Sequence, residues 1–237
     1  MGQQGLDPPF PLKVSPKYEI TKLQSGKIED KIDVFEDQIK GWILDHALWL
    51  VDMSYAGARH AGIAALMLVS TYFEAFAEFD QGVSSDGKSG KFFRHGFLSV
   101  FPETRDMAAK SAGNKAERAI KQVAAALYGQ LRCGLFHEGM IGNKVVLTDG
   151  ASPLRIFWNQ QTEQVVTIII NPQRFALRIR DAFEEYIRRL RDANQKEARA
   201  AFERFWDTRA ARQGAYLASP EELRTILQQG RWHGRQP

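Results

Sequence analysis

Arg132 and His137 are the two residues of this chain whose types and spacing are best suited to chemistry. They lie in the stretch L-R-C-G-L-F-H-E-G, residues 131–139. An imidazole that can be charged near neutral pH is a suitable acid or base. A guanidinium beside it can stabilise a phosphate or a pentavalent transition state. With RNA the substrate 2′-hydroxyl can be the nucleophile, so such a pair needs no metal and no nucleophile of its own.

The spacing of this pair sets a geometric condition. On an ideal α-helix, residues five apart lie about 140° apart around the axis. Both side chains can therefore face one ligand if the helix ends there, or if two copies of the helix meet around a dyad. Gly139 is placed to end the helix in a left-handed turn. His137 then lies in the last turn, where the helix dipole favours its protonated form.

Two other interpretations account for the same residues. Cys133 and His137 are four apart and share a helical face, as a Cys-His nucleophile pair would. Alternatively, Arg132 forms a buried ion pair with Glu74 while His137 caps the helix C-terminus, and the protein has a non-enzymatic interaction role. Glu74 stands on a heavily apolar helix, so it needs either a cationic partner or a route to solvent.

The elements that must position these residues are mostly helices. Apolar spacing of three and four predicts long helices over 32–53, 56–79 and 115–138, with Asn114 and Glu117 as a cap for the third. Three short strands are expected at 144–147, 154–158 and 164–170, as an antiparallel hairpin or meander that packs on the helices. Asn171-Pro172 begins a helix that runs to about residue 192. A charged helix over 195–211 and a short one from Ser219 follow.

The predicted fold is therefore a mainly α helical bundle with a small antiparallel sheet inserted before the last core helix. Residues 1–30 are expected to form an extended N-terminal arm, which is poorly ordered unless something pins it. Residues 31–192 form the helical domain, including the β meander at 144–170. Residues 193–237 form a basic C-terminal helical extension.

Composition limits the class of protein. The chain has 237 residues, 44% hydrophobic residues and one cysteine. These values fit a globular protein of a reducing compartment, and no membrane span or signal peptide is evident, so we expect a cytoplasmic protein.

Residues 171–237 contain 14 Lys or Arg and nine Asp or Glu. This Arg-rich excess suits phosphate contacts, although solvated helix faces explain it as well. Asp45, His46 and Asp52 read as surface polar residues, because no metal-binding spacing joins them.

The segment from Arg132 to His137 resembles the Arg-x4-His motif of HEPN domains (higher eukaryotes and prokaryotes nucleotide-binding), and its L-F-H-x-G form is common in bacterial members. The resemblance covers about residues 32–192. It implies a homodimeric helical bundle with facing motif helices, and a metal-independent endoribonuclease without a cofactor that acts on RNA. It implies Arg132 and His137 as the catalytic pair.

The resemblance also bears on the residues around that pair. Glu74 is similar to the acidic residue that many members place near the arginine, and Cys133, Phe136 and Glu138 are supporting residues. Active members often have Asn, Asp or His where this chain has Cys133. Many members are non-catalytic modules that bind nucleic acid, a nucleotide or a partner protein. Toxin–antitoxin pairing and phage defence both fit the family.

Overall fold

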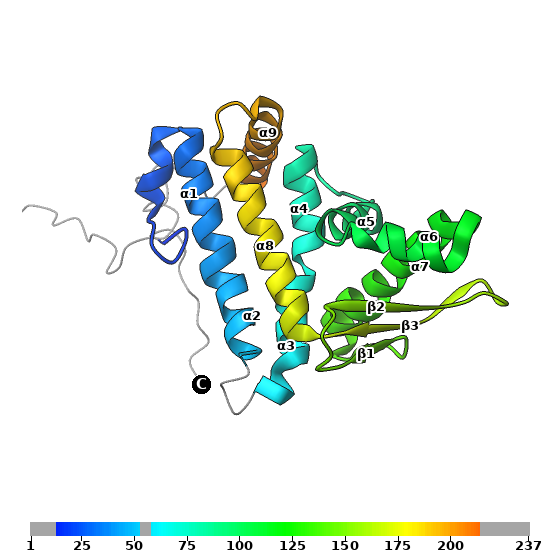
Figure 1. Cartoon of the computed structure of the whole chain (residues 1–237). Coiled ribbons are helices and arrows are strands. Elements are labelled where there is room, and N and C mark those ends of the chain that lie inside the picture. Colours follow the sequence, from blue (N-terminus) through cyan, green and yellow to red (C-terminus); the bar gives the residue numbers. More distant parts are fainter. Residues whose placement is uncertain (1–12, 53–57, 214–237) are drawn as a thin grey trace, which may run out of the picture.

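The computed structural model describes residues 13–52 and 58–213, and these residues are mainly helical (Figure 1). The long rods formed by α1 with α2, by α8, and by α3 with α4 run side by side, while α5–α7 and a small sheet lie to one side of them. The helices are η1 (Ile20–Ser25), α1 (Ile28–Ile39), η2 (Lys40–Leu44), α2 (Asp45–Leu50), α3 (Ala58–Ser70), α4 (Tyr72–Gln81), α5 (Ser89–Val100), α6 (Glu103–Ala112), η3 (Gly113–Lys115), α7 (Ala116–Ala126), η4 (Leu127–Glu138), α8 (Pro172–Arg191) and α9 (Lys196–Gln213).

The three strands are found where the sequence predicted them, but their topology was predicted wrongly. They are β1 (Val145–Leu147), β2 (Leu154–Asn159) and β3 (Gln164–Ile170). The order is β1-β3-β2, with β2 antiparallel to β3 and β1 parallel to it, so the sheet is mixed and not an antiparallel meander. The apolar strand β3 lies at the centre of the sheet, where it can bury side chains between two neighbours. It pairs with β2 along one edge and with β1 along the other.

Two helix starts illustrate how far local signals decide structure. Asn171 caps α8 as predicted, since its side-chain oxygen accepts a hydrogen bond from the Arg174 amide at 3.0 Å. The predicted Asn114 cap is wrong. Asn114 lies in the short helix η3, and α7 begins at Ala116 without a side-chain cap. The helix α6 was not predicted, because its polar sequence carries a weak apolar stripe.

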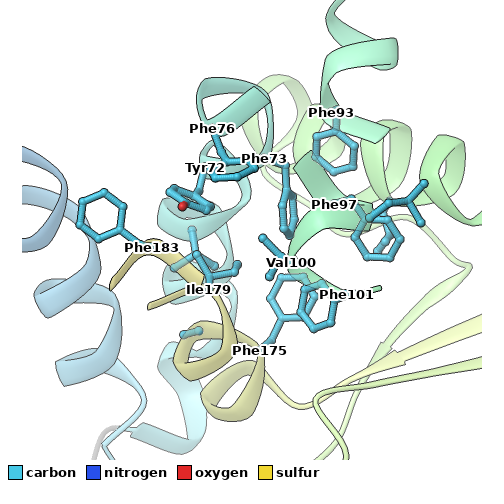
Figure 2. Close-up of a cluster of buried hydrophobic side chains, with 14 of the residues drawn as sticks. Tyr72, Phe73, Phe76, Phe93, Phe97, Val100, Phe101, Phe175, Ile179 and Phe183 are labelled. Carbon is cyan, nitrogen blue, oxygen red and sulfur yellow. The ribbon is translucent and has the colours of Figure 1, made fainter. Parts of the chain in front are cut away.

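The core is built largely from aromatic rings (Figure 2). Phe73 of α4 contacts rings from α5 and α8 and the Phe101 ring, with centroid distances of 5.1–6.2 Å. The α4 and α5 helices approach closely at Gly96, where an added Cβ would lie 1.9 Å from the Phe73 carbonyl oxygen. A larger residue at Gly96 would push the two helices apart, so this glycine sets how α5 sits on α4.

The C-terminal helices are tied to the start of the chain. Lys31 of α1 forms ion pairs with Glu203 and Asp207 of α9, at 2.9 and 2.8 Å. Arg191 at the end of α8 pairs with Asp33 and Glu36 of α1. Phe202 and Trp206 of α9 are buried in the same core as the other helices.

Part of the segment predicted as an arm is folded. The Gln38 side chain donates to the Val14 carbonyl at 2.6 Å, and the Lys17 amide donates to Asp37 at 2.7 Å. These bonds pin residues 13–18 against α1. The predicted short helix from Ser219 and the rest of residues 214–237 lie outside the described residues.

One helical stretch of the described chain, Ala61–Gln81, is long and apolar enough by length and composition to cross a membrane. Half of its most apolar window is buried inside the molecule. It comprises α3 and α4, which pack against α2, α8 and α5. The core helix of a soluble protein has the same properties.

Candidate functional site

The stretch that contains Arg132 and His137 is a π-helix, η4, which continues α7 without a break. A π-helix closes i→i+5 hydrogen bonds, so residues five apart lie about one turn apart and face the same way. The separation of about 140° that is expected on an α-helix therefore does not apply to this pair. In η4 the spacing of five is therefore close to one helical turn, which places Arg132 and His137 nearer to each other around the axis than an α-helix would.

Arg132 lies between two aromatic rings and a carboxylate. Its guanidinium carbon is 5.8 Å from the Tyr128 ring centroid and 5.4 Å from that of Phe136. Its Nη2 is 3.6 Å from Glu74 Oε2 of α4. The side chains of Arg132 and Glu74 are 29% and 16% exposed, so the pair is partly buried and still open to solvent on one side.

The Glu74 carboxylate is held from its other side by Ser85, in the loop between α4 and α5. The Ser85 hydroxyl donates to Glu74 Oε1 at 2.8 Å, and the Ser85 amide donates to Glu78 Oε1 at 2.8 Å. Ser85 is 7% exposed. One carboxylate oxygen of Glu74 therefore binds Ser85, while the other faces Arg132.

His137, Phe136 and Glu138 are exposed at the end of η4. Gly139 ends the helix as predicted, with a φ of 68° and an amide that donates to the Gly134 carbonyl. The Met140 amide donates to the same carbonyl at 3.3 Å. Since backbone amides cap this end, the structure does not support a capping role for His137. Its side chain makes no hydrogen bond or ion pair with any described residue.

Cys133 contacts Tyr128, which is also five residues away on η4. Burial, followed by the charge of the nearby Cys133, raises the pKa of Tyr128. Cys133 is partly exposed. Within residues 13–52 and 58–213, no hydrogen bond joins it to His137, so the geometry gives no support to a Cys-His nucleophile pair.

Large apolar side chains are exposed around this site. Phe136 and Met140, in and just after η4, are 43% and 66% exposed. Ile63 and Met67, on the outward side of α3, are 44% and 37% exposed, and α3 packs against η4. Exposed apolar groups that gather on adjoining elements mark a surface suited to a partner.

Two other groups of polar residues considered in the sequence lie apart from this cluster. Asp45, His46 and Asp52 are exposed, in agreement with their interpretation as surface polar residues. The arginines of α8 and α9 mostly pair with carboxylates of the same chain, which reduces the charge they could offer to phosphates; examples are Arg180, Arg188, Arg189, Arg191 and Arg199. Across the described part of the chain, no three His, Cys, Asp or Glu side chains are grouped to hold a metal ion.

Sequence reasoning missed three residues that shape the site. Ser85 lies in a polar Gly/Ser-rich loop that carries no periodic signal. Tyr128 was not singled out because nothing in the local residue pattern indicates that η4 is a π-helix. Gln130 accepts from the Lys144 amide at 2.8 Å through its side chain and from the Gly142 amide at 3.0 Å through its carbonyl. It therefore folds the chain back along η4 toward β1.

Comparison with known proteins gives no match: no family model, no curated protein and no solved structure is significantly similar to this chain.

Proposed function

We propose that this protein is a metal-independent endoribonuclease of the HEPN type, with Arg132 and His137 as its catalytic residues. The observation that supports the proposal is the π-helical geometry of η4, in which a spacing of five is close to one turn, together with a His137 side chain that makes no hydrogen bond or ion pair with any described residue. The spacing of five, which is a poor match to an α-helix, suits this segment. Both residues reach solvent, so a substrate phosphate could contact them.

The proposed reaction is cleavage of RNA by its own 2′-hydroxyl. A general base removes the 2′-hydroxyl proton, O2′ attacks the adjacent phosphorus, and the P–O5′ bond breaks as a general acid protonates the leaving O5′. The products are a 2′,3′-cyclic phosphate and a 5′-hydroxyl. His137 serves as acid or base, and the Arg132 guanidinium stabilises the charge on the non-bridging oxygens of the pentavalent transition state.

The reaction needs two proton transfers, and one histidine per chain provides one group at a time. We therefore propose a homodimer in which η4 helices face each other and each site uses residues of both subunits. Support comes from Phe136 and Met140, which are exposed beside the motif. The twofold arrangement would cover these side chains, and Glu138 would lie at the edge of the interface.

The second candidate is a non-catalytic dimeric module of the same fold that binds nucleic acid, a nucleotide or a partner protein such as an antitoxin. The Arg132–Glu74 pair favours it, since an arginine held at 3.6 Å from a carboxylate can serve packing alone. The two candidates differ in whether RNA is broken, and an electrostatic binder would also lose RNA affinity steeply with salt.

The test is cleavage of RNA by the purified full chain in excess EDTA, with analysis of the product ends. His137→Gln and Arg132→Lys remove the imidazole and the planar guanidinium without large changes in volume. His46→Gln and Arg118→Lys are matched controls, because both residues are exposed and lie outside the site. We expect cyclic-phosphate ends, a loss of rate of about a hundredfold or more in each site variant, and unchanged rates in the controls.

The possible outcomes separate the candidates. Intact RNA, with site variants as stable as the wild type, supports the binding module and contradicts the nuclease. Intact RNA with Arg132→Lys strongly destabilised assigns Arg132 a structural role. Cleavage that persists in both site variants would place the activity elsewhere.

A further inference from the structure

The helical rod formed by α1, η2 and α2 has one face that is covered at one end and exposed at the other. Phe35, Gln38, Trp42 and Trp49 follow one another along it at spacings of three, four and seven, which place them along one side of the rod. Phe35 and Gln38 are 2% and 7% exposed, whereas Trp42 and Trp49 are 47% and 57% exposed. The face therefore becomes exposed between Gln38 and Trp42.

The covered end of this face lies under α9, which runs parallel to α1. Arg199 pairs with Glu29 at 2.6 Å, and Gln38 lines a small depression together with Ala210. Positions along the two helices thus advance in the same direction. The α9 helix ends at Gln213, about one turn beyond Ala210, which is close to the level at which the face becomes exposed.

The neighbouring rod of α3 and α4 shows a similar change. Gly82 lies against the Ala201 backbone, and the Phe79 ring is 4.7 Å from the Phe205 ring, so α4 runs antiparallel to α9 and α3 lies beyond its end. Phe79 is 1% exposed, whereas Leu68, eleven residues away on the same side, is only partly buried. Because α2 packs on α3, the exposed parts of the two rods adjoin (Figure 1).

The chain that follows α9 has the length and the residue pattern to cover this surface. Residues 214–237 add 24 residues, in which Ser219-Pro220 predicts a helix start. Leu223, Ile226 and Leu227 follow at spacings of three and one, which give the predicted helix one apolar side. A helix over 220–229 is about 15 Å long, and seven residues of the rod, the separation of the two tryptophans, span about 10 Å.

We infer that residues 219–229 dock on the surface formed by α2 and α3, with their apolar side against Trp42 and Trp49. The occupant is a segment of the same chain, because the chain leaves α9 at the point where the cover by α9 stops. A tethered segment also meets its docking surface at a high effective concentration, which favours it over a second copy. This inference does not depend on the proposed RNA cleavage, since it uses no residue of η4.

Hydrogen exchange of the full chain, followed by mass spectrometry, tests the inference. We expect the amides of residues 221–229 to exchange at least about tenfold more slowly than in an unstructured peptide of the same sequence, at every protein concentration. Trp42→Asp and Leu223→Asp should each remove most of this protection, because each places a charge in the apolar contact. Leu223→Asp should also speed the exchange of the peptide that contains Trp42 and Trp49.

Two variants are matched controls for this experiment. Phe157→Asp changes an aromatic residue of similar exposure on β2, and Thr225→Asp lies on the opposite side of the predicted helix. Both should leave the protection of residues 221–229 unchanged. Leu223→Asp also keeps the test decisive if Trp42→Asp lowers overall stability, because Leu223 lies outside α1–α9.

Four results would overturn the inference. The first is exchange of residues 221–229 at the rate of an unstructured peptide, and the second is protection that survives both Trp42→Asp and Leu223→Asp. The third is an equal loss of protection in Phe157→Asp or Thr225→Asp. The fourth is protection that rises with protein concentration, which would assign the docking surface to the segment of a second copy.

Discussion

At the scale of single residues, the candidate site depends on how Arg132 is held. Glu74 approaches it from α4, and Tyr128 and Phe136 lie on either side of it along η4. The Ser85 hydroxyl fixes the Glu74 carboxylate in turn. Ser85 therefore acts as a positioning residue, although it does not contact Arg132.

Replacement of Ser85 by Ala should weaken this arrangement. The Glu74 oxygen that loses its donor remains partly buried, so we expect the free energy of unfolding to fall by about 1–2 kcal/mol. If the proposed cleavage occurs, its rate should fall several-fold and recover in Ser85→Thr. Urea unfolding and the cleavage rate are the measurements. Ser89→Ala, on the first turn of α5, serves as the control, and an equal change there would contradict the positioning role.

At the scale of elements, glycines in two neighbouring parts of the fold have opposite surroundings. A Cβ at Gly96 would meet the Phe73 carbonyl, whereas a Cβ at Gly129 would have nothing within 4 Å. Gly96→Ala should lower the free energy of unfolding by about 3 kcal/mol or more. Gly129→Ala should leave it unchanged or raise it by up to about 1 kcal/mol. Chemical denaturation of both variants tests the pair, and similar losses would contradict the packing seen at α4 and α5.

Ion pairs tie the turn between β2 and β3 to the end of η3 and the start of α7. Lys115 and Arg118 both pair with Glu163, and hydrogen bonding from Lys115 lowers the pKa of that carboxyl. A lowered pKa stabilises the folded state above the ordinary Glu value of 4.5, and this contribution is lost as the pH falls through the folded-state pKa. Glu163→Gln should therefore be less stable than the wild type at neutral pH and equal to it in acid.

Thermal unfolding over a pH series measures this effect. Glu117→Gln, on the exposed side of α7, is the control and should follow the wild type throughout. A difference between Glu163→Gln and the wild type that is independent of pH would show that the charge of Glu163 does not fasten the turn.

Most of the helices and all three strands could be predicted from periodicity, since a buried apolar stripe recurs every three to four residues and a strand alternates. The order of the strands in the sheet could not be predicted, because β1 and β2 are both short apolar segments that could have paired with each other. The π-helix could not be predicted either. Residues 127–138 carry an ordinary apolar spacing, and the contacts of η4 with α3 and of Gln130 with the returning chain at Gly142 join segments far apart in the sequence.

For the site, the sequence identified Arg132, His137 and Glu74, and the structure brings Arg132 and Glu74 together. Ser85 and Tyr128 could not be identified from the sequence, because their contacts with the site exist only in the folded chain. Ser85 reaches Glu74 from a loop, and Tyr128 meets Arg132 and Cys133 along η4. Nothing local in their sequence distinguishes them from other polar or aromatic residues.

At the scale of the whole molecule, the exposed side chains beside the motif predict self-association. Phe136→Asp places a charge in the proposed interface and should weaken the dimer by at least about tenfold. Phe157→Asp, at a similarly exposed position on β2, is the control. Sedimentation velocity over a concentration series measures both. A wild-type protein that stays monomeric at high concentration would rule out a site shared between subunits.

The contacts of α9 with α1 also have a consequence for synthesis on the ribosome. Phe35 of α1 packs against Phe202 and Trp206, with ring centroids 5.3 and 6.5 Å apart, and Phe79 of α4 stacks on Phe202. These aromatic faces emerge early, yet their cover is among the last helices to be translated. These rings stay uncovered on the nascent chain until α9 leaves the exit tunnel, so the core is completed late and aggregation must be avoided until then. A protein truncated before Lys196 would expose the same rings permanently.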